Sequence, residues 1–359
     1  MAQPVTAVIG AGIVGCLVAR ELAARDPEVS IMVLDRDTVG AGASRRSAGL
    51  HVPRGATART RRMAAYSHAY YADLQSRRPG VPIHPIGATV ITAHARGDLL
   101  PGGYLRLTAP APAGSVPNRA VLLPEGSRAW HIAGCHYTDV YQLAQIIAAQ
   151  LRPRVRFLEG VAVTGLAPRG RAVTVHGGTG ERLVADRVVL APGPWLRRPG
   201  WHDLVAPLGL RVKKVVALHI EQRPAAADEA VLFDDDDAFL LPVMHRGHWL
   251  FSYSRQEWDV DPDGLTAGLS AADIGPAREL LRRYSPALAD ACGAGRVFCD
   301  AYSPDREPLV RALDAAGRIV FAGAANGSGY RLGPAIASEA VDLLHLRRSE
   351  GVTGDHQYV

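Results

Sequence analysis

Residues 5–15 read VTAVIGAGIVG, an apolar run that leads directly into glycines at positions 10, 12 and 15. The first five residues predict a buried strand, and IVGCLVARELAARD after them has the apolar periodicity of a helix. A second predicted strand, VSIMVL, is followed at once by Asp35. Strand, glycine turn, helix, strand and acid in this order are typical of a dinucleotide-binding unit.

Each residue of this pattern has a physical reason. Gly10 permits a tight turn, Gly12 lets the backbone approach a pyrophosphate, and Gly15 permits close packing of helix on strand. The helix N-terminus offers free N–H groups and the positive end of its dipole to the phosphates. Asp35 is placed to accept hydrogen bonds from a ribose hydroxyl. Nicotinamide and flavin folds share this motif, so it does not identify the dinucleotide.

The rest of the chain predicts an α/β protein in which a β-rich layer is inserted twice into the nucleotide-binding domain. Alternating apolar and polar residues predict antiparallel strands within residues 83–134 and 207–295. Helical patterns cover YTDVYQLAQIIAAQL at 137–151 and a segment near 270–284. We therefore expect a Rossmann-like domain from residues 1–82, 135–206 and 296–349, a mixed, largely antiparallel substrate domain from 83–134 and 207–295, and a polar tail at 350–359.

Composition narrows the function classes. The formal charge is +5 and the basic residues are nearly all arginine, since Lys213 and Lys214 are the only lysines. Arginines are densest between 45 and 62, which leaves a nucleic-acid face as the alternative to arginines spread over the surface. Four cysteines without paired spacing suggest a cytoplasmic setting, and no metal site is predicted. The apolar N-terminal stretch has neither a basic leader nor an uninterrupted span, so no membrane segment is expected there.

A second glycine-rich stretch closes the chain. Residues 323–336, GAANGSGYRLGPAI, follow a predicted strand, RIVFA, and precede a predicted helix. This repeats the strand, glycine turn, helix order of the N-terminal motif. Two helix N-termini are therefore expected to converge on one cofactor.

Taken as a set, five segments resemble the D-amino-acid oxidase superfamily of flavoproteins, within its glycine oxidase and sarcosine oxidase branch. They are VIGAGIVG at 8–15, GASRRSAGL at 42–50, ADRVVLAPGPW at 185–195, SPDREPLV at 303–310 and AGAANGSGYRLGPAIASEAVDLL at 322–344. The resemblance implies FAD bound in an extended form, with the flavin ring between the two domains. It implies an amine-oxidising enzyme that passes a hydride to flavin N5.

The resemblance also implies the cofactor contacts. The ADP portion would meet Gly10, Gly12, Gly15, Asp35 and Arg36, and the adenine would meet the Val163 backbone. The ribityl chain and ring would pass Ala43, Ser44, Arg45, Ala48, Gly49 and Leu50, while Ala191, Gly193 and Trp195 line the middle. The C-terminal loop, Gly327, Ser328, Gly329, Tyr330, Arg331, Leu332 and Gly333, would contact the pyrimidine edge of the flavin, which gains negative charge on reduction.

Arg331 is the predicted anchor for a substrate carboxylate, because the sarcosine oxidase branch has a basic residue at this point of the loop. An arginine can hold a carboxylate with two parallel hydrogen bonds. The other reading makes Arg331 an exposed loop residue or a partner of the flavin. Tyr302, Tyr253 and His51 are further candidates for the substrate pocket. For each of them, ordinary packing is the alternative.

The chain departs from the family pattern at three positions. Asp300 occupies the place where the glycine oxidase branch has a carboxylate-clamping arginine. Leu250 stands where the sarcosine oxidase branch has a lysine that assists reaction with oxygen. Cys299 lies one residue away from the cysteine that carries covalent flavin in some members, so non-covalent FAD is predicted.

The predicted function is oxidation of a small amino acid or a carboxylate-bearing secondary amine to an imine that hydrolyses, with O2 or another acceptor taking the electrons. If O2 is the acceptor, H2O2 is the product. The alternative is a dehydrogenase of a 2-hydroxy acid or of an N–N or N–O bonded intermediate. The oligomeric state is open.

Overall fold

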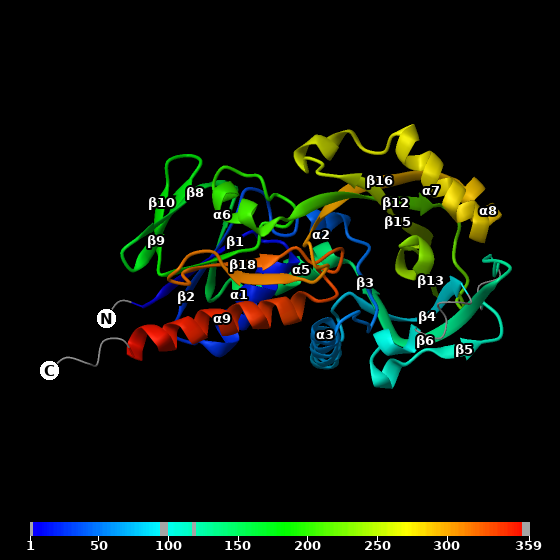
Figure 1. Cartoon of the computed structure of the whole chain (residues 1–359), viewed down its shortest axis with the longest axis horizontal. Helices are drawn as coiled ribbons and strands as arrows, with labels where there is room; N and C mark the ends of the chain where they lie inside the picture. The colour runs from blue at the N-terminus through cyan, green and yellow to red at the C-terminus, as the bar shows by residue number, and fades with distance from the viewer. Residues whose placement is uncertain (1–2, 94–99, 117–119, 354–359) are drawn as a thin grey trace.

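The computed structural model describes residues 3–93, 100–116 and 120–353. The first strand, β1 (Val5–Ile9), and the last helix, α9 (Gly333–Thr353), lie in the same half of the molecule (Figure 1). The other half holds a large sheet built from the middle of the chain. Residues 350–353 of the predicted polar tail complete α9, and residues 354–359 lie outside the described residues.

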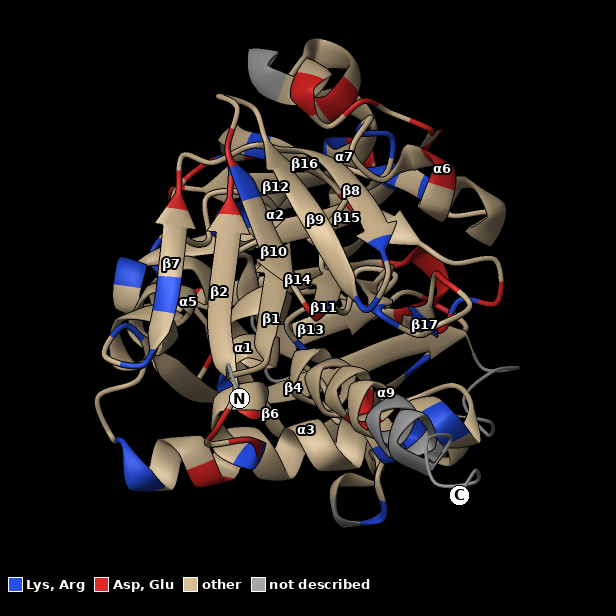
Figure 2. Cartoon of the chain, turned by 90° about the vertical axis from the view of Figure 1, so that its left-hand side faces the viewer, with Lys and Arg blue, Asp and Glu red and all other residues tan. Residues whose placement is uncertain are grey.

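A six-stranded sheet forms the core of the first half, in the order β17-β18-β11-β1-β2-β7. Every neighbouring pair is parallel except β17 with β18. Figure 2 shows acidic residues at the ends of β2 and β7; these are Asp35 and Glu159, which pair in register. Because β1, β2 and β18 end at the same edge, the turns after them meet there. The remaining strands are β2 (Ser30–Asp35), β7 (Val155–Glu159), β11 (Arg187–Leu190), β17 (Leu309–Ala312) and β18 (Ile319–Gly323).

Different layers cover the two faces of this sheet. Val8, Val33 and Val320 face the helices, and their chain neighbours Ile9 and Leu34 face the opposite side, as strand alternation requires. The helical layer consists of α1 (Ile13–Arg25), α3 (Ala58–Arg77), α5 (Val140–Leu151) and α9. The opposite layer is a three-stranded sheet of β8 (Val163–Arg169), β9 (Ala172–Gly177) and β10 (Arg182–Ala185).

The second half is a nine-stranded sheet in the order β16-β12-β15-β14-β13-β4-β6-β3, with β5 paired to β6. Only β4 and β13 pair in parallel, and the other pairs are antiparallel. The strands are β3 (Leu50–His51), β4 (Ile83–Ala93), β5 (Ala111–Ala113), β6 (Ser127–Thr138), β12 (Arg211–Ile220), β13 (Ala230–Phe233), β14 (Ala238–Val243), β15 (His248–Trp258) and β16 (Cys292–Tyr302). The predicted α/β class with an inserted, largely antiparallel sheet is confirmed.

The large sheet also has two distinct faces. Trp249 and Phe251 of β15 pack against α7 (Ala271–Tyr284) and α8 (Pro286–Asp290). Leu250, Val215 and Phe298 belong to a separate core on the opposite face, here called the inner face. Short helical segments link the strands: α2 (Ala43–Arg46), α6 (His202–Val205), η1 (Leu100–Gly103), η2 (Arg106–Thr108), η3 (Ala206–Leu208), η4 (Asp234–Asp236), η5 (Met244–Arg246) and η6 (Asp263–Ala267).

The structure differs from the predicted segmentation at two boundaries and at β3, which lies within the predicted nucleotide-binding segment 1–82 but belongs to the large sheet. The predicted borders at 134/135 and 295/296 fall inside β6 and β16, and both strands belong entirely to the large sheet. A strand hydrogen-bonded along its length to one partner has no natural break within it. The helices predicted at 137–151 and near 270–284 are present as α5 and α7.

Candidate active site

A cavity of about 410 Å³ runs beneath both glycine motifs, at the edge where β1, β2 and β18 end. One end lies at Asp35 and Arg36, and the other lies at Asp300 and the C-terminal loop. Residues predicted as cofactor contacts that line it are Gly10, Gly12, Asp35, Arg36, Ala43, Ser44, Val163, Ala191, Gly193, Trp195, Gly327, Gly329 and Tyr330. The cavity therefore brings together segments that are far apart in the sequence.

The N-terminal glycines leave no room for side chains. A Cβ on Gly10, whose φ is +102°, would lie 2.3 Å from the Ala191 carbonyl oxygen. A Cβ on Gly15 would lie 1.9 Å from the Gly10 carbonyl oxygen. Helix α1 begins at Ile13, whose N–H donates to Ser44 Oγ at 2.9 Å, and its N-cap Gly12 has no side-chain cap. The result is a narrow backbone cradle at a helix N-terminus, which fits the pyrophosphate of a dinucleotide.

Asp35 is fixed by the backbone around it. Its Oδ2 accepts a hydrogen bond from Ala11 N at 2.6 Å, and its Oδ1 accepts one from Asp37 N at 2.9 Å. Burial raises the pKa of Asp35, and these amide hydrogen bonds oppose that rise. A carboxylate has further lone pairs, so Asp35 can still accept a hydrogen bond from a ligand hydroxyl in the cavity.

A clasp of polar contacts closes the Asp35 end of the cavity. Asp263 Oδ1 accepts from Arg36 Nη2 at 2.8 Å and from Trp195 Nε1 at 2.8 Å. Asp263 Oδ2 accepts from Arg198, and the Arg36 guanidinium lies 4.6 Å from the Trp195 ring centre. Three cavity-lining side chains are therefore held by one aspartate from the second inserted segment. Neither Asp263 nor Arg198 was predicted from the sequence.

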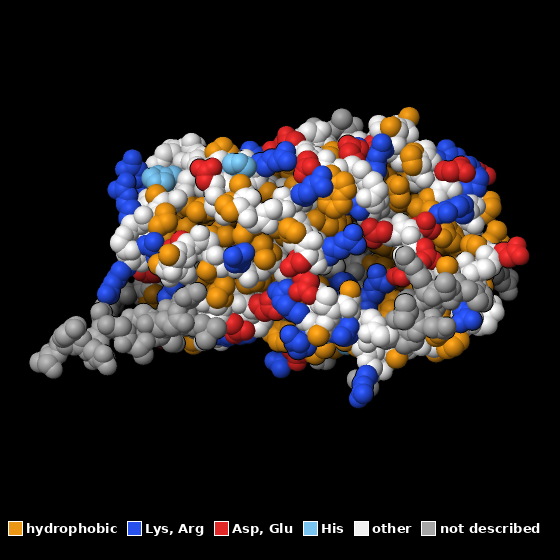
Figure 3. Space-filling view, viewed as in Figure 1, with side chains coloured by type: hydrophobic (Ala, Val, Ile, Leu, Met, Phe, Trp, Pro, Cys, Tyr) orange, Lys and Arg blue, Asp and Glu red, His pale blue; other side chains and the backbone are white. Residues whose placement is uncertain are grey.

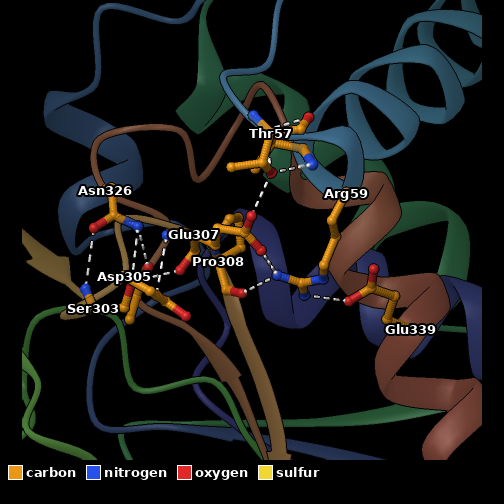
Figure 4. Close-up of polar contacts among 10 residues, drawn as sticks. Thr57, Arg59, Ser303, Asp305, Glu307, Pro308, Asn326 and Glu339 are labelled. Carbon is orange, nitrogen blue, oxygen red and sulfur yellow. Dashed lines mark hydrogen bonds and ion pairs between the residues drawn. The ribbon is translucent and has the colours of Figure 1, made fainter.

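The segment that follows β16 supports the C-terminal loop (Figure 4). Ser303 N donates to Asn326 Oδ1 at 3.0 Å, and Ser303 Oγ donates to Asp305 at 2.8 Å. Glu307 accepts from Arg59 at 3.0 Å, and Arg59 also pairs with Glu339 of α9 at 2.6 Å. The SPDREP motif thus ties the loop to the starts of α3 and α9.

Arg331 extends from this loop toward the segment after β3. Its guanidinium donates to the carbonyl oxygens of Val52 and Arg54 and, at 2.9 Å, to Ser328 Oγ. Across the described ranges it has no carboxylate partner. Burial, and then the charge of Arg54, lower the pKa of Arg331. Arg54 forms an ion pair with Asp234 at 2.6 Å. Of these two neighbouring arginines, Arg331 is therefore the one whose hydrogen-bond acceptors are all neutral.

His51 lies in a buried aromatic group behind the loop. Its ring stacks on His136, with centroids 4.4 Å apart, and lies 5.6 Å from the His68 ring. His136 Nε2 is 2.9 Å from Tyr330 Oη, and Tyr71 Oη donates to the Tyr330 carbonyl at 2.7 Å. Burial, then the charge of His136, then that of Arg331 lower the pKa of His51. The group holds Tyr330, which lines the cavity, from behind.

Tyr302 and Tyr253 lie on opposite faces of the large sheet. Tyr302 Oη is 3.6 Å from where a Cβ on Gly327 would lie, so it is beside the cavity. Tyr253 packs with the core beneath α7 and α8 and does not reach the inner face. Tyr253 was a candidate for the substrate pocket with ordinary packing as the alternative, and it packs, because its place in the alternation of β15 turns it toward these helices.

Other predicted contacts serve packing instead of lining the cavity. Arg45 is exposed, and its guanidinium lies 5.7 Å from the Tyr141 ring centre. A Cβ on Gly49 would lie 2.0 Å from the Thr138 carbonyl oxygen, and one on Gly333 would lie 2.8 Å from Leu17. Leu332 is part of the helical core. Residues absent from the cavity lining are Gly15, Arg45, Ala48, Gly49, Leu50, Ser328, Arg331, Leu332 and Gly333.

The cavity also contains lining residues that sequence reasoning did not assign to it, among them Ser47, Val140, Thr164, Arg198 and Asp300. Asp300 could have been assigned to the site from the sequence, because it departs from the family pattern. The sequence does not indicate that Thr164 and Val140 line the cavity, because their positions depend on how separate segments pack.

Two arginines of the predicted basic stretch form ion pairs with acidic residues of other segments. Arg54 pairs with Asp234, and Arg59 pairs with Glu307 and Glu339. Figure 3 shows acidic and basic side chains intermixed over the face that it presents. Neither observation favours a nucleic-acid interface. Within the described residues, no helix has the length and apolar character needed to cross a membrane.

Comparisons with known proteins identify the family and the fold. Residues 6–343 match the family model described as FAD dependent oxidoreductase. The chain is 26% identical to 4-methylaminobutanoate oxidase (formaldehyde-forming) of Paenarthrobacter nicotinovorans, over 94% of this chain and 43% of that protein. The chain thus spans less than half the length of this curated relative.

Two solved structures show the same fold at low identity. Glycine oxidase from Bacillus cereus superposes with a TM-score of 0.77 at 15% identity, covering 96% of this chain and 95% of that one. L-proline dehydrogenase from P. horikoshii superposes with a TM-score of 0.78 at 17% identity, covering 95% and 93%. With the glycine cradle, the acid after β2 and the family match over most of its length, the chain belongs to the FAD-dependent oxidoreductase family.

Proposed function

We propose that this protein oxidises a small amino acid, or a secondary amine that carries a carboxylate, by hydride transfer to FAD. FAD, when bound, supplies the hydride acceptor. The product would be an imine that hydrolyses in water. The protein's own residues would bind the carboxylate, orient the C–H bond and hold the cofactor.

The observation that carries this proposal is the charge state around Arg331. A partly buried guanidinium whose hydrogen-bond partners are all neutral is unfavourable, because burial of a charge is costly without an opposite charge. A ligand carboxylate would supply that charge and could form two parallel hydrogen bonds. The loop that carries Arg331 also lines the cofactor cavity through Gly329 and Tyr330. A carboxylate held there would lie beside the cofactor.

The predicted binding residues fit FAD held without a covalent bond. Gly10, Gly12 and Ser44 would hold the pyrophosphate, and Asp35 would hold a ribose hydroxyl. Cys299 is buried in the core that includes Trp201 and Val212, and burial raises the pKa of its thiol to about 12. A buried neutral thiol is a poor nucleophile, which supports non-covalent binding.

The amine class is supported by two relatives, a 4-methylaminobutanoate oxidase and a glycine oxidase. O2, reduced to H2O2, is the proposed electron acceptor. Leu250 is buried in the inner-face core where the family resemblance would place a lysine, so the acceptor needs a direct test. All four cysteines are free, in keeping with the proposed cytoplasmic location.

The test is anaerobic mixing of the FAD-loaded protein with a panel of amino acids, N-methyl amino acids and 2-hydroxy acids, followed by flavin absorbance. We expect bleaching by at least one carboxylate-bearing amine. Mass spectrometry then distinguishes ammonia or a free amine from a keto acid formed without amine release. Bleaching by 2-hydroxy acids alone would establish the 2-hydroxy acid alternative, and an unchanged spectrum across the panel would contradict both the amine and the 2-hydroxy acid assignments.

A further inference from the structure

Asp300 lies at the loop end of the cavity, on the inner face of the large sheet. In the antiparallel register of β12 and β16, Asp300 lies opposite Lys213. Its side chain is on the same face of β16 as those of Phe298 and Tyr302. Its Oδ2 lies 4.0 Å from where a Cβ on Gly327 would be, and both residues line the cavity. The carboxylate therefore faces the cavity at the end opposite Asp35.

The surrounding residues do not neutralise this carboxylate. No hydrogen bond or ion pair to the Asp300 side chain is present among residues 3–93, 100–116 and 120–353. Lys213, the nearest cation in the register, has its Nζ 3.6 Å from Asp237 and over the rings of Trp258 and Tyr302. Burial alone raises the pKa of Asp300 to about 6. The titratable or charged groups on the elements around Asp300 are Lys213 of β12, Arg46 of α2, Cys299 and Tyr302 of β16, Asp237 after η4, Asp261 and Asp263 before and at the start of η6, and Tyr330 in the loop.

This placement matters because the loop end is where the pyrimidine edge of the flavin is expected. Two-electron reduction adds negative charge to that edge, and an ionised carboxylate nearby would oppose it. Protonation of Asp300 would remove the repulsion. A neutral acid could also donate a hydrogen bond toward the cofactor.

We propose that Asp300 binds a proton when the cofactor in this cavity is reduced, so that reduction is coupled to proton uptake on β16. The inference rests on the proposed function only in placing FAD in this cavity. In the balanced step, two electrons and one proton enter the flavin, and a second proton from solvent enters the Asp300 carboxylate. Without Asp300, only the flavin proton accompanies the two electrons.

The experiment is electrochemical titration of the FAD-loaded protein at several pH values between 7 and 8.5, where the Asp300 carboxylate is ionised before reduction, without any amine substrate. Each proton taken up changes the reduction equilibrium tenfold per pH unit, which is about 30 mV for a two-electron couple. We expect the midpoint potential of the wild-type protein to fall with pH twice as steeply as that of Asp300→Asn. Glu279→Gln, at an exposed position on α7, is the matched control and should keep the wild-type slope.

Equal slopes in wild type and Asp300→Asn would overturn the proposal. A wild-type midpoint potential that falls by only one proton per two electrons, about 30 mV per pH unit, would also overturn it. That slope can be measured even if Asp300→Asn does not bind FAD. Asp300→Ser is the second variant. Because no substrate is used, these results are separate from those of the amine panel. A failed panel would remove the proposed substrate class and leave the slopes unaffected.

Discussion

The two ends of the cofactor cavity differ in how their charged groups are paired. At the N-terminal end, Asp35 accepts two backbone N–H groups, and Asp263 holds Arg36 and Arg198. At the loop end, Arg331 donates only to neutral oxygens, and Asp300 has no partner within the described part of the chain.

This difference separates two tasks. An end that only binds the cofactor can be preorganised fully by the protein, because its ligand does not change during the reaction. An end where substrate enters and charge develops needs groups that complete their pairing with a ligand or a proton. Under the proposed function, cofactor affinity would depend on the N-terminal end and substrate affinity on the loop end.

The largest effect is expected from a substitution that disrupts the N-terminal glycine cradle. Gly15→Val would drive a side chain into the Gly10 carbonyl, because even a Cβ would lie 1.9 Å from that oxygen. We expect the free energy of unfolding to fall by about 3 kcal/mol and FAD to be lost. Thermal unfolding and flavin content measure this.

Gly329→Ala is the matched control for that change. It alters a glycine that lines the same cavity but has no atom within 4 Å of an added Cβ. Retained FAD in Gly15→Val would show that the cradle is not the binding site.

A smaller effect should come from the Asp263 clasp. Asp263→Ala removes the partners of Arg36, Trp195 and Arg198 and leaves substrate groups in place. We expect the Kd for FAD to rise about tenfold, since partly exposed ion pairs and one hydrogen bond together contribute on the order of 1–2 kcal/mol. Flavin fluorescence quenching measures the Kd. Asp259→Ala, which removes a surface pair with Arg211, should leave the Kd unchanged. Equal effects of the two variants would contradict the role of the clasp.

The smallest expected effect concerns the support behind the loop. Tyr71→Phe removes the hydrogen bond to the Tyr330 carbonyl, with a cost of about 1 kcal/mol in stability. Chemical denaturation should show this loss, while FAD affinity changes little. Tyr66→Phe, at an exposed position on the same helix, is the control. A large loss of FAD in Tyr71→Phe would contradict the assignment of cofactor affinity to the N-terminal end of the cavity.

Much of this arrangement could be predicted from the sequence, for physical reasons that are local. Gly10, Gly12, Gly15 and Asp35 act within one strand–turn–helix–strand unit, so their spacing is sufficient to place them. The antiparallel class of the inserted sheet follows from alternation along its strands.

The remaining features depend on packing between distant segments. Alternation places Tyr253 on one face of β15 but does not say that α7 covers that face. Arg45 turns toward Tyr141 of α5 because the short helix α2 directs it there. The Asp263 clasp joins residues more than 60 positions apart and leaves no local pattern.

Titration with simple carboxylates distinguishes Arg331 as the proposed carboxylate anchor from Arg331 as a structural residue of the loop. FAD-loaded wild type, Arg331→Leu and Arg45→Leu are titrated with acetate and propionate, and binding is followed by the change in flavin absorbance. Loss of two charge-assisted hydrogen bonds of about 1.5 kcal/mol each predicts a roughly 100-fold higher Kd in Arg331→Leu, with FAD retained and Arg45→Leu unchanged. An unaltered Kd for these carboxylates in Arg331→Leu, or release of FAD from that variant, would contradict the role of Arg331 as the carboxylate anchor.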